Sequence, residues 1–193
     1  SKVKHEIKDG TATMNLNIVE KQLTGSSNID LPDILYLGTS YKLSKFTFEL
    51  DAQRTGWSSY DKLAVDFEDP TATDISKPKD WKDVWAYRFG VQYKVNDMLD
   101  LRAGLIRDFS PIPDKTLDPL VPSGDRWLYA VGFGLNFGSL SLDFAYNYLD
   151  DENRKFDNEV GKTYLGPLLV NKVTGEFKSV DAHIFGINVT YKF

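Results

Sequence analysis

The chain has 193 residues, of which 41% are hydrophobic and 13% aromatic, and its formal net charge at pH 7 is −5. Its length suits one domain with a sizeable core, and its acidic balance argues against nucleic acid as a partner. The lack of cysteine excludes disulfide bonds and cysteine-based zinc sites, and no apolar run approaches the roughly 18 residues of a membrane helix.

Apolar and polar residues alternate along most of the chain, with the period of two that is typical of a β-strand between two environments. The opening stretch SKVKHEIK already alternates, so we expect the chain to begin within a strand, as a piece of a mature or longer protein would. Further alternating segments follow at residues 34–43, 45–53, 85–95, 99–107, 126–137, 139–149 and 181–193. Together these segments predict about eight strands.

The predicted connections alternate in length. Short turns fall near 43–44, 96–97 and 138–139, whereas the long loops fall near 9–32, 56–83, 108–125 and 150–180. Two-residue turns join antiparallel neighbours. Short turns at one end and long loops at the other are typical of the up-and-down barrels of the bacterial outer membrane.

The two faces of the predicted strands differ in character. One face is apolar and has aromatic residues near the strand ends. The opposite face is rich in glycine, alanine and charged residues, including Arg88, Lys94, Asp100, Arg102 and Asp143. A soluble sandwich or a lipocalin-like barrel also alternates and remains an alternative. An apolar outer band with aromatic girdles and a polar interior favours a membrane barrel.

We therefore predict an all-β fold, a transmembrane antiparallel up-and-down β-barrel in the bacterial outer membrane. Residues 1–193 would form a single β-barrel domain or a barrel fragment. The closing strand ends on an aromatic residue, Phe193. This resembles the C-terminal signature of Gram-negative outer-membrane proteins that the outer-membrane assembly machinery reads. Alternatively, Phe193 only anchors its strand at the membrane interface.

Two stretches resemble the FadL-type outer-membrane transporters of long-chain fatty acids and hydrocarbons. The first is FELDAQRTGWSSYDKLAVDF, and the second is LRAGLIRDFSPIPDKTLDPLVPSGDRWLYAVGFGLNF. The family has an arginine–alanine–glycine strand, a loop with serine–proline–x–proline–aspartate, a proline, and then aspartate–arginine before the next strand. The matching residues are Arg102, Ala103, Gly104, Ser110, Pro111, Pro113, Asp114, Pro122, Asp125 and Arg126. The resemblance runs from about residue 1 to Phe193.

The resemblance implies a fourteen-stranded barrel with an N-terminal hatch, of which the eight predicted strands would be the last. We see neither the hatch nor the kinked third strand that opens a lateral exit in the family. The chain would then be part of a larger protein, or a truncated or engineered barrel. The implied function is passive transport of hydrophobic compounds through a barrel lumen. A non-transporting or engineered scaffold or adhesin is the alternative, followed by a soluble lipid-binding barrel.

Apolar residues on loops that should be polar are the candidate ligand contacts for a hydrophobic small molecule. They are Ile112, Leu117, Leu120, Val121, Tyr164, Leu165, Leu168 and Leu169. An exposed apolar patch often marks a binding site. The alternative is that these residues pack on the barrel mouth or on each other.

The inward Arg88 and Arg102 could meet the carboxylate head group of a ligand. Buried charges are costly unless they are paired, so the alternative is that these arginines pair with acidic residues across the lumen. The candidate acids are Glu49, Asp51, Asp100 and Asp143.

We expect no enzyme, metal or cofactor; since some outer-membrane barrels are enzymes, hydrolase activity is the alternative. The chain contains only two histidines, His5 and His183, and no Ser-His-Asp arrangement can be placed in one region. The acidic runs DFEDP and DDEN lack the spacing of a calcium loop and are better explained as solvated loops. The expected partners are a hydrophobic ligand, the lipid bilayer with its lipopolysaccharide, and the assembly machinery.

Overall fold

The computed structural model describes residues 4–8, 11–15, 24–118, 121–158, 163–165, 168–170 and 173–193. Side chains are described over 24–118, 121–158 and 174–193. The chain divides into two compact units. One unit comprises Ser1–Asn28 and Ala64–Ile75, and the other comprises Ile29–Leu63 and Ser76–Phe193.

The smaller unit contains short antiparallel pairs. Strand β1 (Lys4–Lys8) pairs with β2 (Thr11–Asn15). Strand β3 (Gly25–Ser26) pairs with Asp66 and Phe67 of β6 (Lys62–Phe67), which belongs to this unit from Ala64 onward. Strand β7 (Ile75–Pro78) follows along the chain, and only its first residue belongs to this unit. The opening segment is thus a strand, as its alternation predicts, but it forms a hairpin with β2 and is not an eighth long strand. Alternation gives no information on which strand is the partner.

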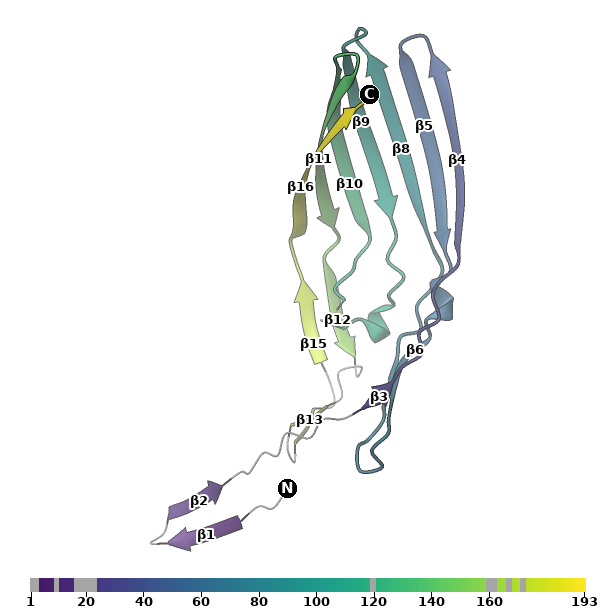
Figure 1. The fold of residues 1–193 in the computed structure, drawn as a ribbon. Coiled ribbons are helices and arrows are strands. Elements are labelled where there is room, and N and C mark those ends of the chain that lie inside the picture. The colour runs from purple at the N-terminus through teal and green to yellow at the C-terminus, as the bar shows by residue number, and fades with distance from the viewer. Residues whose placement is uncertain are drawn as a thin grey trace. The chain divides into compact units, whose positions relative to one another are not determined.

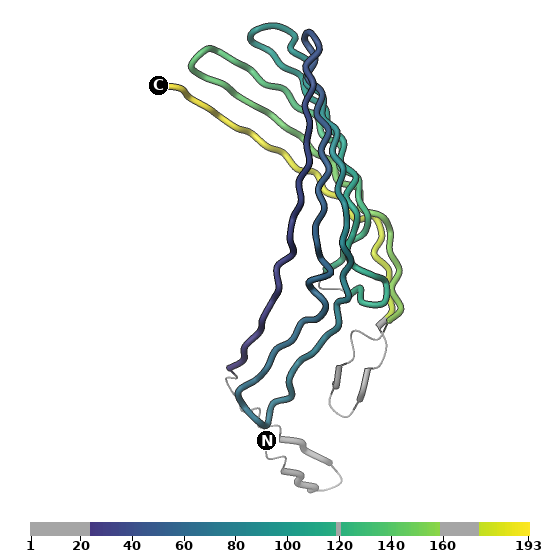
Figure 2. Tube along the Cα trace, turned by 90° about the vertical axis from the view of Figure 1, so that its right-hand side faces the viewer, coloured from purple at the N-terminus to yellow at the C-terminus, as the bar shows by residue number. Residues whose placement is uncertain are grey.

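The larger unit contains a seven-stranded antiparallel sheet in the order β16-β11-β10-β9-β8-β5-β4 (Figure 1). The strands are β4 (Ile34–Leu43), β5 (Phe46–Thr55), β8 (Val84–Lys94), β9 (Leu99–Asp108), β10 (Arg126–Asn136), β11 (Leu140–Asp151) and β16 (Val180–Tyr191). Each strand pairs with the next long strand along the chain, which is the predicted up-and-down order. The strands twist together as one sheet (Figure 2). The sheet is open within this chain, with β4 and β16 at its edges.

The pairing register aligns the apolar residues of neighbouring strands on one face. Phe133 pairs with Phe144, and Phe144 pairs with Ile187. Several apolar side chains on this face are exposed: Phe185 retains 76% of its accessible surface and Ile187 retains 70%, whereas Phe144 is half-buried. The apolar residues thus lie on the face that the alternation predicts, and the predicted all-β fold with antiparallel up-and-down strand order is confirmed.

The short turns lie at one end of the sheet, together with the C-terminus (Figure 1). Ser44 and Gly138 adopt positive φ angles of 54° and 82° in two of them, as tight hairpins require. In the third turn, the Asn96 Oδ1 atom accepts hydrogen bonds from the backbone N–H groups of Met98 and Leu99. These local polar contacts fix the hairpin register, and with it the face to which each side chain points.

The long loops at the opposite end of the sheet contain their own small elements. Strand β12 (Arg154–Asn158) pairs with β15 (Val173–Phe177), and β13 (Thr163–Leu165) pairs with β14 (Leu168–Val170). Two 3-10 turns, η1 (Trp57–Ser59) and η2 (Asp114–Thr116), complete the loops. No helix in the described part of the chain is long or apolar enough to cross a bilayer.

Candidate functional site

A cavity of about 500 Å³ lies against the inward face of the sheet. Its floor consists of small residues that are paired across the strands. Gly90 lies opposite Gly104, and Ala145 lies opposite Gly186. Small side chains leave the backbone wall smooth and the space above it free. Inward residues that line the cavity are Thr47, Glu49, Gly90, Gln92, Arg102, Gly104, Ala130, Gly132, Asp143, Ala145, Gly186 and Asn188.

Polar side chains at the edge of this cavity form a hydrogen-bonded group. The Nη1 atom of Arg102 lies 2.6 Å from an oxygen of Asp143, and its Nε donates to Gln92 at 2.9 Å. Asn188 donates to the second Asp143 oxygen at 3.5 Å. Arg102 is therefore paired within the wall, as the alternative interpretation expects. This pairing lowers the cost of a charge beside an apolar ligand.

Arg88 lies on the same inward face, beyond the cavity. Its Nη2 donates to the Gln53 side chain at 2.9 Å, and its guanidinium lies 5.4 Å from the centre of the Tyr36 ring. Its Nη1 is buried and has no hydrogen-bond partner among the residues that the structure describes. Arg88 does not line the inward cavity, and its contact with a ligand carboxylate stays a prediction.

The apolar loop residues have different surroundings. Leu117 is fully buried and Ile112 is 5% exposed; both pack with Phe156 in a small cluster, against which Trp81 and Phe177 also lie. These two residues thus pack on each other, as the alternative to ligand contact expects, and a ligand would have to open the cluster to touch them. Clusters of this kind are common under long loops.

The remaining loop candidates have less structural information. Val121 is exposed, and Leu120 lies outside the described residues. The backbones of Tyr164 and Leu165 in β13 pair with those of Leu169 and Leu168 in β14, but their side chains lie outside the described set. For these residues ligand contact stays a prediction.

Arg154 connects the loops around the buried cluster. Its guanidinium donates to the backbone oxygens of Ser123 at 2.7 Å and Ile112 at 2.8 Å, and it forms an ion pair with Asp114. Asn158 donates to the Leu117 backbone oxygen at 2.7 Å. Buried backbone groups need such partners when no sheet supplies them, so this polar frame holds the loop cluster closed.

Trp81 packs against this cluster and contacts two further aromatic residues, and the sequence pattern did not identify any of the three. The Trp81 ring contacts the rings of Trp57 and Tyr60 edge-on, with both centroid distances at 5.0 Å. The Trp81 indole N–H is buried and has no acceptor within the described part of the chain. Aromatic residues in a polar loop give the same signal as the apolar residues chosen above, and that signal could have identified these three from the sequence.

Asp83 anchors this loop at the start of β8. Hydrogen bonds from Ser58, first of all from its backbone N–H, hold the pKa of the Asp83 carboxyl below its ordinary value of 3.8, and the nearby Arg54 guanidinium lowers it further. A lowered pKa stabilises the folded loop above the pKa of the unfolded chain, and this stability is lost as the pH falls through the folded pKa. We expect acidification below about pH 4 to speed exchange of the Ser58 amide hydrogen, corrected for intrinsic exchange rates. In Asp83→Asn this extra acid sensitivity should be absent; if it persists, another group is responsible.

Comparison with known proteins agrees with this arrangement. The profile of the family described as "Outer membrane protein transport protein (OMPP1/FadL/TodX)" matches residues 1–193. The chain is 27% identical to outer membrane protein P1 of Haemophilus influenzae over 196 aligned positions, covering all of this chain and 42% of that protein. It is 25% identical to a 47 kDa outer membrane protein of Pasteurella multocida, covering 90% of this chain and 37% of that protein.

A crystal structure of a Pseudomonas aeruginosa FadL homologue has the same fold. It superposes with a TM-score of 0.71 at 27% identity, over 86% of this chain and 37% of that one. The chain thus spans about two fifths of the length of these relatives.

The open seven-stranded sheet, its lipid-facing apolar side and its inward cavity are all consistent with one segment of such a barrel wall. The relatives are named outer membrane proteins, and the family is one of outer-membrane transport proteins, which confirms the predicted location and the expectation of a protein that is not an enzyme. The chain belongs to the OMPP1/FadL/TodX family of outer-membrane transport proteins.

Proposed function

We propose that the protein to which this chain belongs carries long-chain fatty acids or hydrocarbons passively across the outer membrane. The observation that supports this most is the cavity on the inward face, with its floor of glycine and alanine. Its volume of about 500 Å³ falls within the range of ligand sites, roughly 300–1,000 Å³. A flat, small-residue wall can contact an alkyl chain along its length, and each buried methylene contributes about 0.8 kcal/mol.

In this proposal the loops act first and the lumen second. The aromatic group of Trp57, Tyr60 and Trp81 offers a hydrophobic contact on the long-loop side, from which the ligand passes to the inward cavity. Arg88, with one unused donor, would meet a carboxylate where the cargo has one. Hydrocarbons lack that group and would use the apolar surface alone.

The alternative is a barrel that does not transport, such as a scaffold or adhesin. The closed cluster around Leu117 and the internal pairing of Arg102 favour this alternative function, because neither group is available to contact a ligand. The two functions differ in one measurable respect, which is uptake through the lumen.

Uptake of labelled oleate by cells that make the full-length protein distinguishes the two functions. The substitution Gly90→Leu fills part of the cavity, and a Cβ at Gly90 meets only the Glu49 Cβ, at an ordinary 3.7 Å. We expect uptake to fall several-fold while the amount of folded barrel is unchanged. Ala103→Leu, on the lipid-facing side of the neighbouring strand, is the control and should transport normally. Equal uptake by wild type, Gly90→Leu and cells without the protein would favour the scaffold.

We also propose that Phe193 contributes to recognition by the outer-membrane assembly machinery. Its ring is fully exposed and lies 5.1 Å from that of Tyr191, edge-on, just beyond the last strand. Deleting Phe193 should reduce the fraction of protein that migrates as a folded, heat-sensitive band from cells, whereas refolding of the purified protein into detergent should be little changed. Equal loss in both assays would instead indicate a purely structural anchor.

A further inference from the structure

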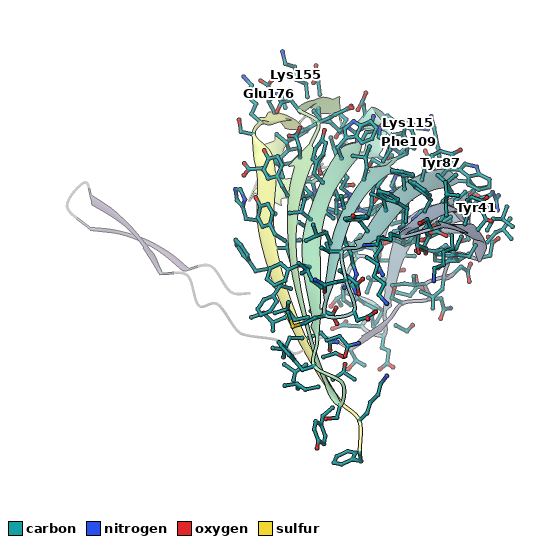
Figure 3. The ribbon with its side chains drawn as sticks, turned by 90° about the horizontal axis from the view of Figure 1, so that it is seen from above. Tyr41, Tyr87, Phe109, Lys115, Lys155 and Glu176 are labelled. Carbon is teal, nitrogen blue, oxygen red and sulfur yellow. The ribbon has the colours of Figure 1, made fainter. Side chains whose placement is uncertain are left out.

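The charged residues of the inward cavity are unevenly distributed. Within the described part of the chain, three charged side chains line it: Glu49, Arg102 and Asp143. Two anions and one cation leave a net formal charge of −1 above a floor of glycine and alanine. The tyrosines Tyr41 and Tyr87 lie on the other, outward side of the sheet and do not line this cavity (Figure 3).

The one cation of the cavity is held in the barrel wall. Arg102 belongs to β9 and Asp143 to β11, so their ion pair of 2.6 Å crosses strand β10, which lies between them. The pair crosses at Gly134, where a Cβ would lie 2.8 Å from Asp143 Oδ1 and 3.0 Å from Arg102 Nη2. Gln92 accepts a further hydrogen bond from the Arg102 Nε at 2.9 Å. Arg102 is thus neutralised within the wall, and a ligand carboxylate that approached it would also meet Asp143.

Glu49 lies at the other side of the cavity, on β5, and its charge is not neutralised. In the sheet it pairs with Ser40 and Gly90, which carry no charge. Its exposed side chain forms no hydrogen bond or ion pair with any residue that the structure describes. Lys42, two residues beyond Ser40 on β4, does not line the cavity. The Glu49 carboxylate therefore acts directly on a group that enters the cavity.

The position of Glu49 decides what a ligand meets. Strands β5 and β11 are four strand spacings apart in the sheet, which is about 19 Å along the wall. The Arg102 guanidinium is directed to Asp143 on the far side, so no free cation lies near Glu49. A carboxylate head over Gly90 would be a second anion beside Glu49, whereas a hydroxyl head would donate a charge-assisted hydrogen bond to it.

We propose that Glu49 determines the specificity of the inward cavity for the head group of an amphiphile. It excludes a carboxylate and admits an alkyl chain together with an uncharged hydroxyl head, because like charges repel more strongly in a confined lumen than in bulk water. A long-chain alcohol is the preferred amphiphile, and a fatty acid enters this cavity with its alkyl chain only. The inference rests on the proposed transport of hydrophobic compounds and names the head group that the cavity favours.

The test measures binding of dodecanoate, dodecanol and dodecylamine to the purified full-length protein in detergent, by equilibrium dialysis at low ionic strength. At about pH 8 the acid and the amine are both charged. In Glu49→Gln, we expect the affinity for dodecanoate relative to dodecanol to rise about fivefold, and that for dodecylamine relative to dodecanol to fall as much. This is the effect of removing one charge at roughly 10 Å. Partition into detergent is the same for every variant and cancels in the comparison, and high salt should reduce both changes.

Glu68→Gln is the matched control, because Glu68 is an exposed residue of the smaller unit and does not line the cavity. Both affinity ratios should stay within about twofold of the wild type in this variant. If Glu49→Gln has the ratios of the wild type while Gly90→Leu weakens binding, the role of Glu49 is overturned and the proposed function stands. If Gly90→Leu does not weaken binding of any of the three ligands, the cavity is not the ligand site and both proposals are overturned.

Discussion

Replacing Gly132 by leucine is expected to prevent the barrel wall from assembling. A Cβ at this position would lie 2.6 Å from the backbone oxygen of Phe144 on the neighbouring strand, closer than real Cβ contacts allow. A backbone oxygen cannot move aside as a flexible side chain can, so strands β10 and β11 would have to separate. In lipid every strand hydrogen bond lost costs several kcal/mol, since no water replaces it. We expect the folded, heat-sensitive band on a denaturing gel to disappear.

Gly90→Leu is the matched control, because it makes the same change on the same inward face. Its Cβ has ordinary van der Waals space, and leucine suits a strand better than glycine does. This variant should fold as well as the wild type while reducing uptake. If Gly132→Leu also folds normally, the prediction that a side chain at this position clashes with the Phe144 backbone oxygen is wrong. Comparing the two variants therefore distinguishes a glycine that is required for strand pairing, Gly132, from one that leaves space in the lumen, Gly90.

Removing the charge of Lys79 is expected to give the second large effect, in the loops. The Lys79 Nζ lies 2.7 Å from an oxygen of Asp118, and the two side chains are only 6% and 11% exposed. Removing one partner of a buried ion pair typically costs 3–5 kcal/mol, and Lys79 and Asp118 form such a pair. Lys79→Met keeps the length of the side chain and removes the charge. The loop that carries Leu117 should then open more often, which hydrogen exchange and limited proteolysis within residues 110–118 would report as faster exchange and cleavage.

Lys115→Met provides the control for this prediction. Lys115 forms an ion pair of the same length, 2.7 Å, with Asp80, but both side chains are well exposed. Exposed pairs contribute about 0–1 kcal/mol, so exchange and cleavage should change little. If both variants behave alike, burial of the Lys79 pair does not matter for the loop. Lys79→Met should leave the folded band of the barrel intact, because the transmembrane sheet does not depend on this loop.

Much of the barrel wall could be predicted from the sequence because its signal is local. Alternation with a period of two identifies a strand and the face of every residue on it. Phe185 and Ile187 are exposed on the lipid side for this reason, and Gly90 and Gly104 lie opposite each other on the other. Two strands joined by a short turn pair with each other in antiparallel orientation, so the sequence order of the long strands also predicts their order in the sheet.

The site was predicted less completely, because its contacts join residues that are distant in sequence. The interpretation of Ile112 and Leu117 as free loop contacts could not be tested without Phe156, which closes their cluster from β12. Arg102 meets Asp143 only because the register of β9, β10 and β11 places the two side chains together. No pattern among neighbouring residues in the sequence predicts which side chains of different strands come into contact.

The sequence by itself determined the strand segments, their two faces and the family, since each depends on residues close together or on a recurring motif. Only the tertiary structure decided that the opening segment pairs with β2, that Asp143 is the partner of Arg102, and that the inward cavity exists. The physical reason is that pairing partners and cavities depend on register and loop packing between distant segments, whereas the hydrophobic pattern specifies only which side of a strand avoids water.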